Sequence, residues 1–297
     1  MKRTWKDWVV AVRPWSFPAS AMPVVATLCY LYWYGVDMDW TGGLLALLGM
    51  VLFQAAGNTW SDYFDYKRGV DAPDTLGVHI LTDGVFRPRE VVALSVALLT
   101  TAVAVGLALV WRAGWPVLAV GLCGVACTLL YPPLKYRAWG DVVILMAYAV
   151  LPSLGTSYVA CATFERAVLV LVPPVGLITV AILHANNTRD VPTDRRASIR
   201  TLPMAIGTRA SVRLYRAEVL LPFAWLAGGV CLGAFPVWAL LTFVALKPAL
   251  AAARRMDAFP TQGQQAIAQL DEATAQLQLM FSVLLSVALL VSAWTGL

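Results

Sequence analysis

The sequence predicts an all-α, multi-pass transmembrane helix bundle with about nine spans. Apolar residues make up 60% of the 297-residue chain and charged residues only 13%, whereas a soluble domain has about 45–50% and about 25%. The apolar residues are also gathered in runs of roughly 20, which is the length that crosses a bilayer as a helix. These observations exclude a soluble enzyme, a disordered chain and a secreted disulfide scaffold.

Nine apolar runs follow one another along the chain. The first is too long for the core of a signal peptide and lacks a small-residue cleavage site, so we expect it to remain as a span. A short turn around Gly233 and Pro236 separates the seventh from the eighth. We expect one integral-membrane domain over residues 1–297, built from two similar helical halves, about 1–140 and 141–297. The expected spans are 16–36, 42–60, 91–111, 115–131, 142–160, 167–185, 217–233, 235–251 and 276–295.

Basic residues predict the orientation of the chain in the membrane. Nine spans place the two termini on opposite sides. With the N-terminus in the cytoplasm, 20 of the 22 lysines and arginines fall inside, and only Arg112 and Arg166 fall outside. Cytoplasmic loops carry such an excess of Lys and Arg. The prediction is a protein of the cell inner (cytoplasmic) membrane whose N-terminus and active site face the cytoplasm.

The connections between spans differ in length on the two sides. The outer ones are short, and the inner ones are long, at about 61–90, 132–141, 186–216 and 252–275. Long connections in a compact protein are usually functional, so we expect the chemistry at the inner face. No Walker A loop, GxSxG elbow or HExxH helix supports soluble-type nucleotide or hydrolase chemistry. The five cysteines fall in or at the ends of spans, as packing residues do.

A first acidic cluster lies at the inner end of the second span. Asn58, Asp62 and Asp65 are spaced i, i+4, i+7 and therefore share one face of a helix. Asp71 and Asp74 follow closely. The aromatic residues between them, Trp60, Tyr63, Phe64 and Tyr66, belong either to an interfacial belt or to the wall of a cation-forming site.

A second acidic cluster repeats this pattern at the inner end of the sixth span. Asn186, Asp190 and Asp194 are spaced i, i+4, i+8, although Pro192 can break the helix between the last two. Asn187 and Arg189 lie within the same segment. Each cluster thus begins with an amide and ends with carboxylates where an apolar helix reaches the interface.

The two clusters together predict a metal–diphosphate site. Carboxylates at membrane depth are costly and usually functional, although a single cluster could also act as a helix cap. Hard oxygen ligands suit Mg²⁺, which binds through a few carboxylates and substrate phosphates. Charge-assisted bonds to phosphate are available from nearby basic side chains, namely Lys67, Arg68, Lys135, Arg137 and Arg189.

These residues resemble the two Asp-rich motifs of the UbiA superfamily of intramembrane aromatic prenyltransferases. Further segments are similar to family motifs: Ala11-Val12-Arg13-Pro14, the stretch from Tyr131 to Tyr136 followed by Gly140-Asp141, Arg200-Thr201-Leu202, and Leu277-Gln278-Leu279-Met280. The matches run along almost the whole chain. The chain departs from the family at Ser61, where an asparagine is usual.

Within the superfamily the chain resembles the MenA branch, the 1,4-dihydroxy-2-naphthoate polyprenyltransferases. The third aspartate of the first motif comes late, as Gly69-Val70-Asp71. The second motif, with Asn-Asn-Thr-Arg-Asp at 186–190 and then Asp194-Arg195, is typical of that branch and of its animal relatives that make vitamin K₂.

The resemblance implies Mg²⁺-dependent transfer of a polyprenyl group from its diphosphate to an aromatic acid in menaquinone biosynthesis. It implies Mg²⁺ as the cofactor. The implied partners are the two substrates and the lipid membrane, with no nucleic acid among them. Asp71 and Asp141 are candidates for the base that takes the phenolic proton. The implied metal ligands and catalytic residues are Asp62, Asp65, Asp190 and Asp194, with Asp71 also catalytic. The implied substrate- and diphosphate-binding residues are Arg13, Asn58, Lys67, Lys135, Tyr136, Asn186, Asn187 and Arg189.

Two alternatives stay open at this point. The acceptor could be 4-hydroxybenzoate, homogentisate or a haem vinyl group, and the late third aspartate argues against the first of these. The acidic clusters could instead bind cations in a membrane transporter. Transporter sites commonly lie at the membrane midplane between inverted repeats, whereas both clusters here lie at one interface.

Overall fold

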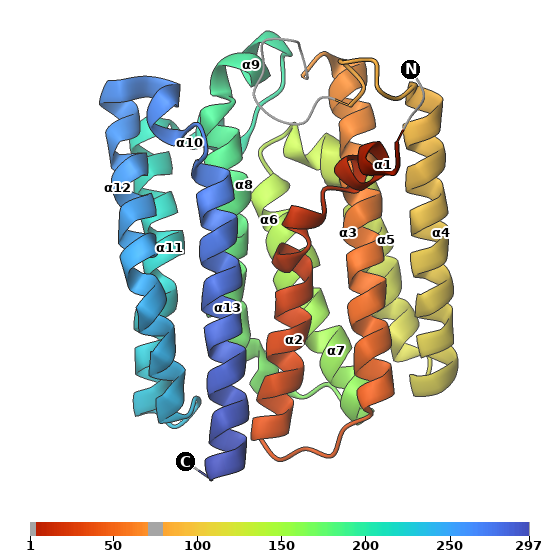
Figure 1. Ribbon diagram of the computed structural model, residues 1–297, viewed down its shortest axis with the longest axis vertical. Coiled ribbons are helices and arrows are strands. Elements are labelled where there is room, and N and C mark those ends of the chain that lie inside the picture. Colours follow the sequence, from red (N-terminus) through yellow and green to blue (C-terminus); the bar gives the residue numbers. More distant parts are fainter. Residues whose placement is uncertain (1–3, 71–79, 297) are drawn as a thin grey trace.

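Long apolar helices running side by side build the molecule (Figure 1). The computed structural model describes residues 4–70 and 80–296. Within these ranges no β-strand forms, and extended segments meet only in an isolated bridge between Arg137 and Arg200. The all-α prediction is therefore confirmed.

The first half of the chain contributes the helices on the right of Figure 1. Proline at the first helical position starts α2, α4 and α5, where its missing N–H costs nothing. Helix α3 begins after Asp39, whose side chain accepts a bond from the Thr41 N–H, and ends at Gly69 in the left-handed conformation. The elements are α1 (Trp5–Val12), η1 (Pro14–Ser16), α2 (Pro18–Trp33), α3 (Trp40–Arg68), α4 (Pro88–Ala113) and α5 (Pro116–Lys135).

The second half contains several segmented helices. Pro173 and Pro174 lie in the π-helical turn η4, where the wider turn accommodates residues that cannot donate an N–H. The elements are α6 (Gly140–Leu145), η2 (Met146–Val150), α7 (Leu151–Cys161), η3 (Arg166–Leu171), η4 (Val172–Gly176), α8 (Leu177–Arg189), α9 (Val191–Arg196), α10 (Leu202–Ile206), α11 (Thr208–Cys231), η5 (Val237–Ala245), α12 (Leu246–Gln262), η6 (Gly263–Ile267) and α13 (Leu270–Thr295).

Eight helical segments of the described ranges are long and apolar enough to cross a membrane. They correspond to eight of the nine predicted runs, so the chain is a multi-pass membrane protein. The remaining predicted run, 16–36, corresponds to α2, which has 16 residues and is about 24 Å long. Most of α2 is buried, and it packs against α3, α7 and α13. Neighbouring helices thus cover this shorter helix.

The expected long inner loops are largely helical, which corrects the sequence interpretation. Helix α3 continues through both aspartates of the first cluster to Arg68. Residues 186–216 contain the end of α8, the short helices α9 and α10, and the start of α11, and α12 continues to Gln262. Hydropathy measures only the stretch that fits the hydrocarbon core, whereas backbone hydrogen bonding continues a helix into water wherever the residues allow it.

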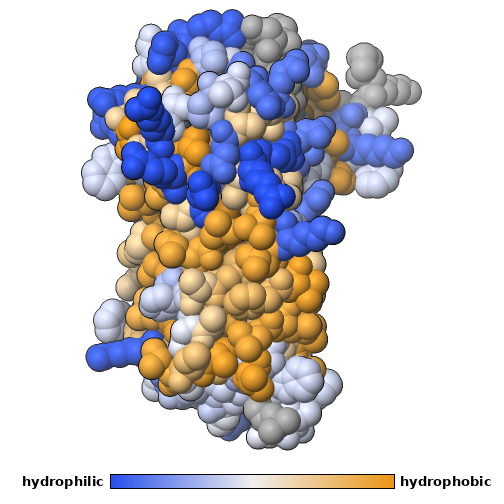
Figure 2. Space-filling model, turned by 90° about the vertical axis from the view of Figure 1, so that its left-hand side faces the viewer, coloured by the Kyte–Doolittle hydropathy of each residue, from blue (hydrophilic) through white to orange (hydrophobic). Residues whose placement is uncertain are grey.

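One end of the bundle is hydrophilic. Figure 2 shows polar side chains gathered above a broad apolar belt on the face formed by the C-terminal helices. Helices α1, α9 and α10 lie at this end, and the C-terminus lies at the other (Figure 1). The termini therefore lie at opposite ends, as an odd number of spans requires. Assignment of the hydrophilic end to the cytoplasm stays a prediction.

Candidate functional site

A cavity of about 520 Å³ opens among the helices. Its polar part is lined by residues of both acidic clusters, including Asn58, Asp65, Asn186, Asp190 and Asp194. Its apolar part continues between α4, α5 and α7, where the lining side chains include Val103, Leu107, Leu122 and Leu151. The cavity therefore joins an acidic end to a lipid-like interior.

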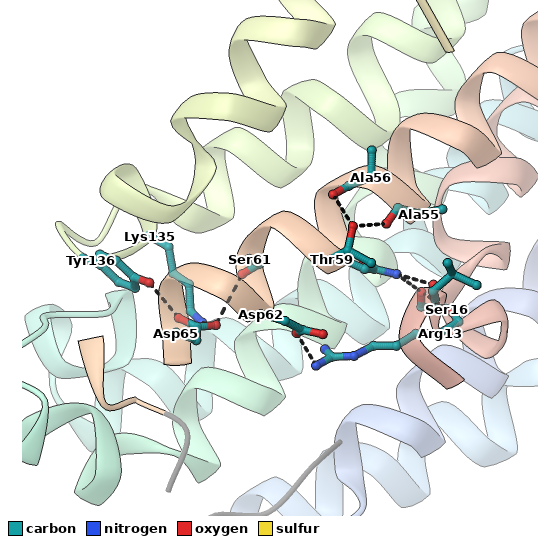
Figure 3. Close-up of polar contacts among 12 residues, drawn as sticks. Arg13, Ser16, Ala55, Ala56, Thr59, Ser61, Asp62, Asp65, Lys135 and Tyr136 are labelled. Carbon is teal, nitrogen blue, oxygen red and sulfur yellow. Dashed lines mark hydrogen bonds and ion pairs between the residues drawn. The ribbon is translucent and has the colours of Figure 1, made fainter. Parts of the chain in front are cut away.

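Asp65 is the centre of the first cluster (Figure 3). Lys135 approaches one carboxylate oxygen to 3.2 Å, and the Tyr136 hydroxyl donates to the other at 2.7 Å. Ser61 donates to the Lys135-bound oxygen at 3.3 Å. Both Asp65 and Lys135 are buried, so the attraction between them is weakly screened. The structure thus brings Asp65 together with Lys135 and Tyr136, which lie 70 and 71 positions later in the chain.

Asp62 lies one turn earlier on α3 and binds Arg13, which follows α1 (Figure 3). Arg13 has a φ of 53°, in the left-handed region, and this turn leads into η1. Asn58 donates at 3.0 Å to the Val12 carbonyl and to the Ser16 hydroxyl. These contacts fix the N-terminal segment against the first cluster. Asp62 itself is not among the residues that line the cavity.

Arg189 organises the second cluster. Its guanidinium donates two bonds to Asp190, at 2.8 and 3.0 Å, and one to Asp271 of α13 at 2.7 Å. It also donates to the side-chain oxygen of Asn186. Because all four residues line the cavity, Arg189 joins the end of α8 to the start of α13 at its polar end. Asn187 is buried and lines the same cavity.

Asp194 is buried on α9, after a break in the helix. Helix α8 ends at Arg189, and Pro192 occupies an early position of α9, so the predicted i, i+8 pattern does not run along one continuous helix. Burial raises the pKa of Asp194 to about 7; Lys135 lowers it, and Asp190 and Asp65 raise it. The carboxylates of the two clusters are therefore close enough to repel one another, and Lys135 attracts Asp65 and Asp194 alike.

Three predicted site residues, Asp62, Lys67 and Tyr136, do not line the cavity. Lys67 is exposed, does not line the cavity, and lies 6.0 Å from the ring of Tyr63. Asp62 and Tyr136 instead contact residues that line the cavity, namely Arg13 and Asp65 respectively. Asp71, together with Asp74, lies outside the described residues.

The aromatic wall of the cavity comes from unexpected positions. None of Trp60, Tyr63, Phe64 and Tyr66 lines it, and the first three instead contact one another with ring centroids 5.1–6.4 Å apart. The aromatic residues that do line the cavity are Trp15, Phe53, Tyr131 and Tyr148. The sequence signal for this aromatic lining was a tyrosine within an apolar span, such as Tyr148.

A third group of ionisable residues was missed by the sequence analysis. Asp141, His184 and Glu218 are all buried and lie together between α6, α8 and α11. None of them lines the cavity, and the role of Asp141 as a base stays a prediction. The signal in the sequence was Glu218, a carboxylate inside the seventh apolar run.

Comparison with known proteins decides the family. The profile described as the UbiA prenyltransferase family matches residues 20–270. The chain belongs to the UbiA prenyltransferase family. This membership favours the prenyltransferase prediction over a transporter.

Individual relatives agree with this assignment. The chain is 31% identical over 228 residues to UbiA prenyltransferase domain-containing protein 1 of Xenopus tropicalis, covering 75% of this chain and 66%, just under two thirds, of that protein. The Drosophila melanogaster homolog is 32% identical, with 95% of this chain and 79% of the other covered. The 1,4-dihydroxy-2-naphthoate octaprenyltransferase of Bacillus subtilis is 25% identical, with 94% and 91% covered.

Solved structures share the fold. The apo structure of a UbiA homolog from Aeropyrum pernix K1 matches with a TM-score of 0.71 at 15% identity, covering 93% of this chain and 97% of that one. A homolog from Archaeoglobus fulgidus bound to GPP and Mg²⁺ matches with a TM-score of 0.63 at 15% identity, covering 94% and 99%. The helix arrangement is therefore that of the UbiA fold.

Proposed function

We propose that the protein transfers a polyprenyl group from polyprenyl diphosphate to 1,4-dihydroxy-2-naphthoate, a step of menaquinone biosynthesis, at the cytoplasmic side of the membrane. One observation carries the proposal: two acidic clusters and Lys135 meet at the polar end of a cavity whose remainder is apolar. Such a cavity suits a substrate with a charged head and a hydrocarbon tail.

The polar end fits Mg²⁺ in its donor set. Asp65, Asp190 and Asp194 supply only oxygen atoms and line the cavity, and hard oxygen ligands suit this ion. We assign the metal to these three; Asp62, which binds Arg13 and does not line the cavity, is a fourth ligand only by the family resemblance. When bound, Mg²⁺ supplies charge that stabilises the departing diphosphate.

The remaining polar residues bind and orient the diphosphate. Lys135 is buried beside Asp65 and carries a positive charge at the cavity wall. Arg189 holds Asp190 and Asn186 in place through its fork of donors. Cleavage of the allylic C–O bond then leaves a carbocation and a diphosphate whose added charge faces Lys135.

The apolar interior protects the carbocation. Tyr131 and Tyr148 line the cavity, and the π-faces of aromatic rings attract cations. Exclusion of water keeps the carbocation available for the aromatic ring. The ring carbon forms the new C–C bond, and its carboxylate leaves as CO₂ with the electrons of the broken bond restoring aromaticity.

The choice of acceptor rests on the sequence and on one relative. The late Asp71 and the Asn-Asn-Thr-Arg-Asp segment are typical of the naphthoate branch. The Bacillus subtilis relative carries that activity in its name and is covered over 91% of its length. 4-Hydroxybenzoate and homogentisate are the competing acceptors.

Membranes containing the protein should be incubated with a polyprenyl diphosphate, Mg²⁺ and a panel of aromatic acids, with products identified by mass. We expect prenylated, decarboxylated naphthoate. Asp65→Asn, Asp190→Asn and Asp194→Asn should each lower the rate by about 10²-fold or more. The surface variant Asp257→Asn, whose partner is Arg216, is the matched control. Product from another acid alone would refute the naphthoate assignment, and normal rates in all three variants would refute the site.

A further inference from the structure

Three buried side chains from three helices converge away from the cavity. Asp141 of α6, His184 of α8 and Glu218 of α11 are 6%, 0% and 3% exposed. One ligand atom from each lies within 4.8 Å of the others. None of the three lines the cavity that carries the acidic clusters, so this group is separate from the diphosphate site.

His184 is held in a fixed orientation. Its Nδ1 lies 2.9 and 3.1 Å from the two Glu218 oxygens, and its Nε2 lies 2.8 Å from the Ser211 hydroxyl. Ser211 is in turn 3.0 Å from the Thr188 hydroxyl. With Nε2 held by Ser211, Nδ1 is the nitrogen that would bind a metal beside the Glu218 oxygens; a partner on one ring nitrogen that orients the other is the usual surrounding of a metal-binding histidine.

Asp141 has no such partner among the described residues. Both of its carboxylate oxygens are buried, and neither makes a hydrogen bond. A buried carboxylate without a partner is unfavourable, because nothing compensates for its lost hydration. The oxygens nevertheless lie beside His184 and Glu218, so the carboxylate points at a place where a cation would satisfy it.

The charge of the group also calls for a cation. Two carboxylates face one imidazole, and all three side chains are buried. Lys135 is a nearby cation, since its backbone contacts Gly140, the residue before Asp141. Its ammonium group is bound to Asp65 instead. Tyr215 packs edge-on against His184, with the two ring centroids 6.1 Å apart.

We propose that Asp141, His184 and Glu218 bind one divalent transition-metal ion, for which Zn²⁺ is the best match. Imidazole nitrogen with carboxylate oxygens is a donor set that zinc uses. Mg²⁺ prefers oxygen ligands alone, so this site differs in chemistry from the acidic clusters. The metal would tie α6, α8 and α11 together and thereby support α8, whose end carries Asn186 and Arg189.

The test uses the full-length protein, purified in detergent from cells grown with added zinc. Metal content after brief chelation with EDTA is measured by mass spectrometry, and Zn²⁺ is then returned during thermal unfolding. Co²⁺ substituted for zinc reports imidazole and carboxylate coordination in its visible spectrum. We expect one zinc per chain, a Tm that falls by roughly 5 °C when it is removed, and a Co²⁺ spectrum typical of mixed nitrogen and oxygen ligation.

Variants locate the metal. Asp141→Asn and Glu218→Gln should weaken Zn²⁺ binding by about 100-fold or more, and Ser211→Ala by about 10-fold. Asp65→Asn and Asp190→Asn, which alter the acidic clusters, should keep the zinc. Retention of zinc by Asp141→Asn would overturn the proposal. The proposal would also be overturned if wild-type protein holds less than about 0.1 zinc per chain and its Tm does not change when zinc is added. This second result does not depend on whether any variant folds.

Discussion

Replacement of Lys135 by methionine tests the geometry of the first acidic cluster. Lys135 and Asp65 are both buried, with 3.2 Å between the ammonium nitrogen and a carboxylate oxygen. At an effective dielectric constant of about 20 their attraction is about 5 kcal/mol. Part of this attraction offsets the cost of burying the two charges, and removal of one partner of a buried pair typically costs about 3–5 kcal/mol.

We expect the lower end of that range, about 3 kcal/mol, because the Tyr136 hydroxyl still donates to Asp65 at 2.7 Å. For a chain of this size the loss corresponds to a fall in Tm of roughly 6–12 °C. The assay is thermal unfolding in detergent with EDTA, followed by tryptophan fluorescence. With Mg²⁺ present the fall should be smaller, because a metal ion bound to Asp65 replaces the missing positive charge.

Lys67→Met is the matched control, since it removes the same charge from the same end of the bundle. Lys67 is exposed and lies 6.0 Å from the Tyr63 ring, so its replacement should change stability by less than about 0.5 kcal/mol. Prenyl transfer should fall by about 10²-fold in Lys135→Met and hardly at all in the control. Equal effects of the two substitutions on both stability and rate would refute the reasoning.

Two further predictions concern pH and packing. Burial raises the pKa of Asp194 to about 7, well above its usual value of about 3.9, so the metal-free protein should lose stability as the pH rises from about 4 to 8. Over the same interval Mg²⁺ should bind more tightly, and its binding should release a proton. Calorimetry in buffers of different ionisation enthalpy measures that proton release. A Mg²⁺ affinity that falls as the pH rises would contradict this sign. Gly229→Ala would place a methyl group 2.5 Å from the Phe235 ring, so unfolding should become easier by about 1–3 kcal/mol. Its neighbour Gly228 has open space at the same position, so Gly228→Ala should be neutral or stabilising by up to about 1 kcal/mol; similar losses in the two variants would show that the contact with the ring is not the cause.

Local features of the site were predictable because they follow the chain. Asn58, Asp62 and Asp65 share a face of α3 since the helical repeat places residues three, four and seven apart side by side. The composition of the second cluster and a break at Pro192 were predictable. The position of Asp194 was not, because it depends on tertiary contacts such as the bond that the Thr201 hydroxyl donates to it at 3.4 Å. Polar residues that continue the helices beyond the membrane were interpreted as loops, since hydropathy alone does not report helix length.

Contacts between distant segments were not predictable in this way. The pairs Arg13–Asp62, Lys135–Asp65 and Arg189–Asp271 join residues 49, 70 and 82 positions apart. The choice of partner depends on which faces of two helices meet, and many faces of a membrane helix are similarly apolar. The same reason hid Asp141 beside His184 and Glu218, which come from three helices.

The sequence by itself determined the membrane class, the spans and the residues available for chemistry, because burial of apolar length and helical periodicity are properties of a single segment. The tertiary structure decided which carboxylate has a cation, which lies in the cavity and which is left without a hydrogen-bond partner. Those outcomes depend on distances of a few ångströms between helices, where charge interactions in a weakly screened interior are strongest.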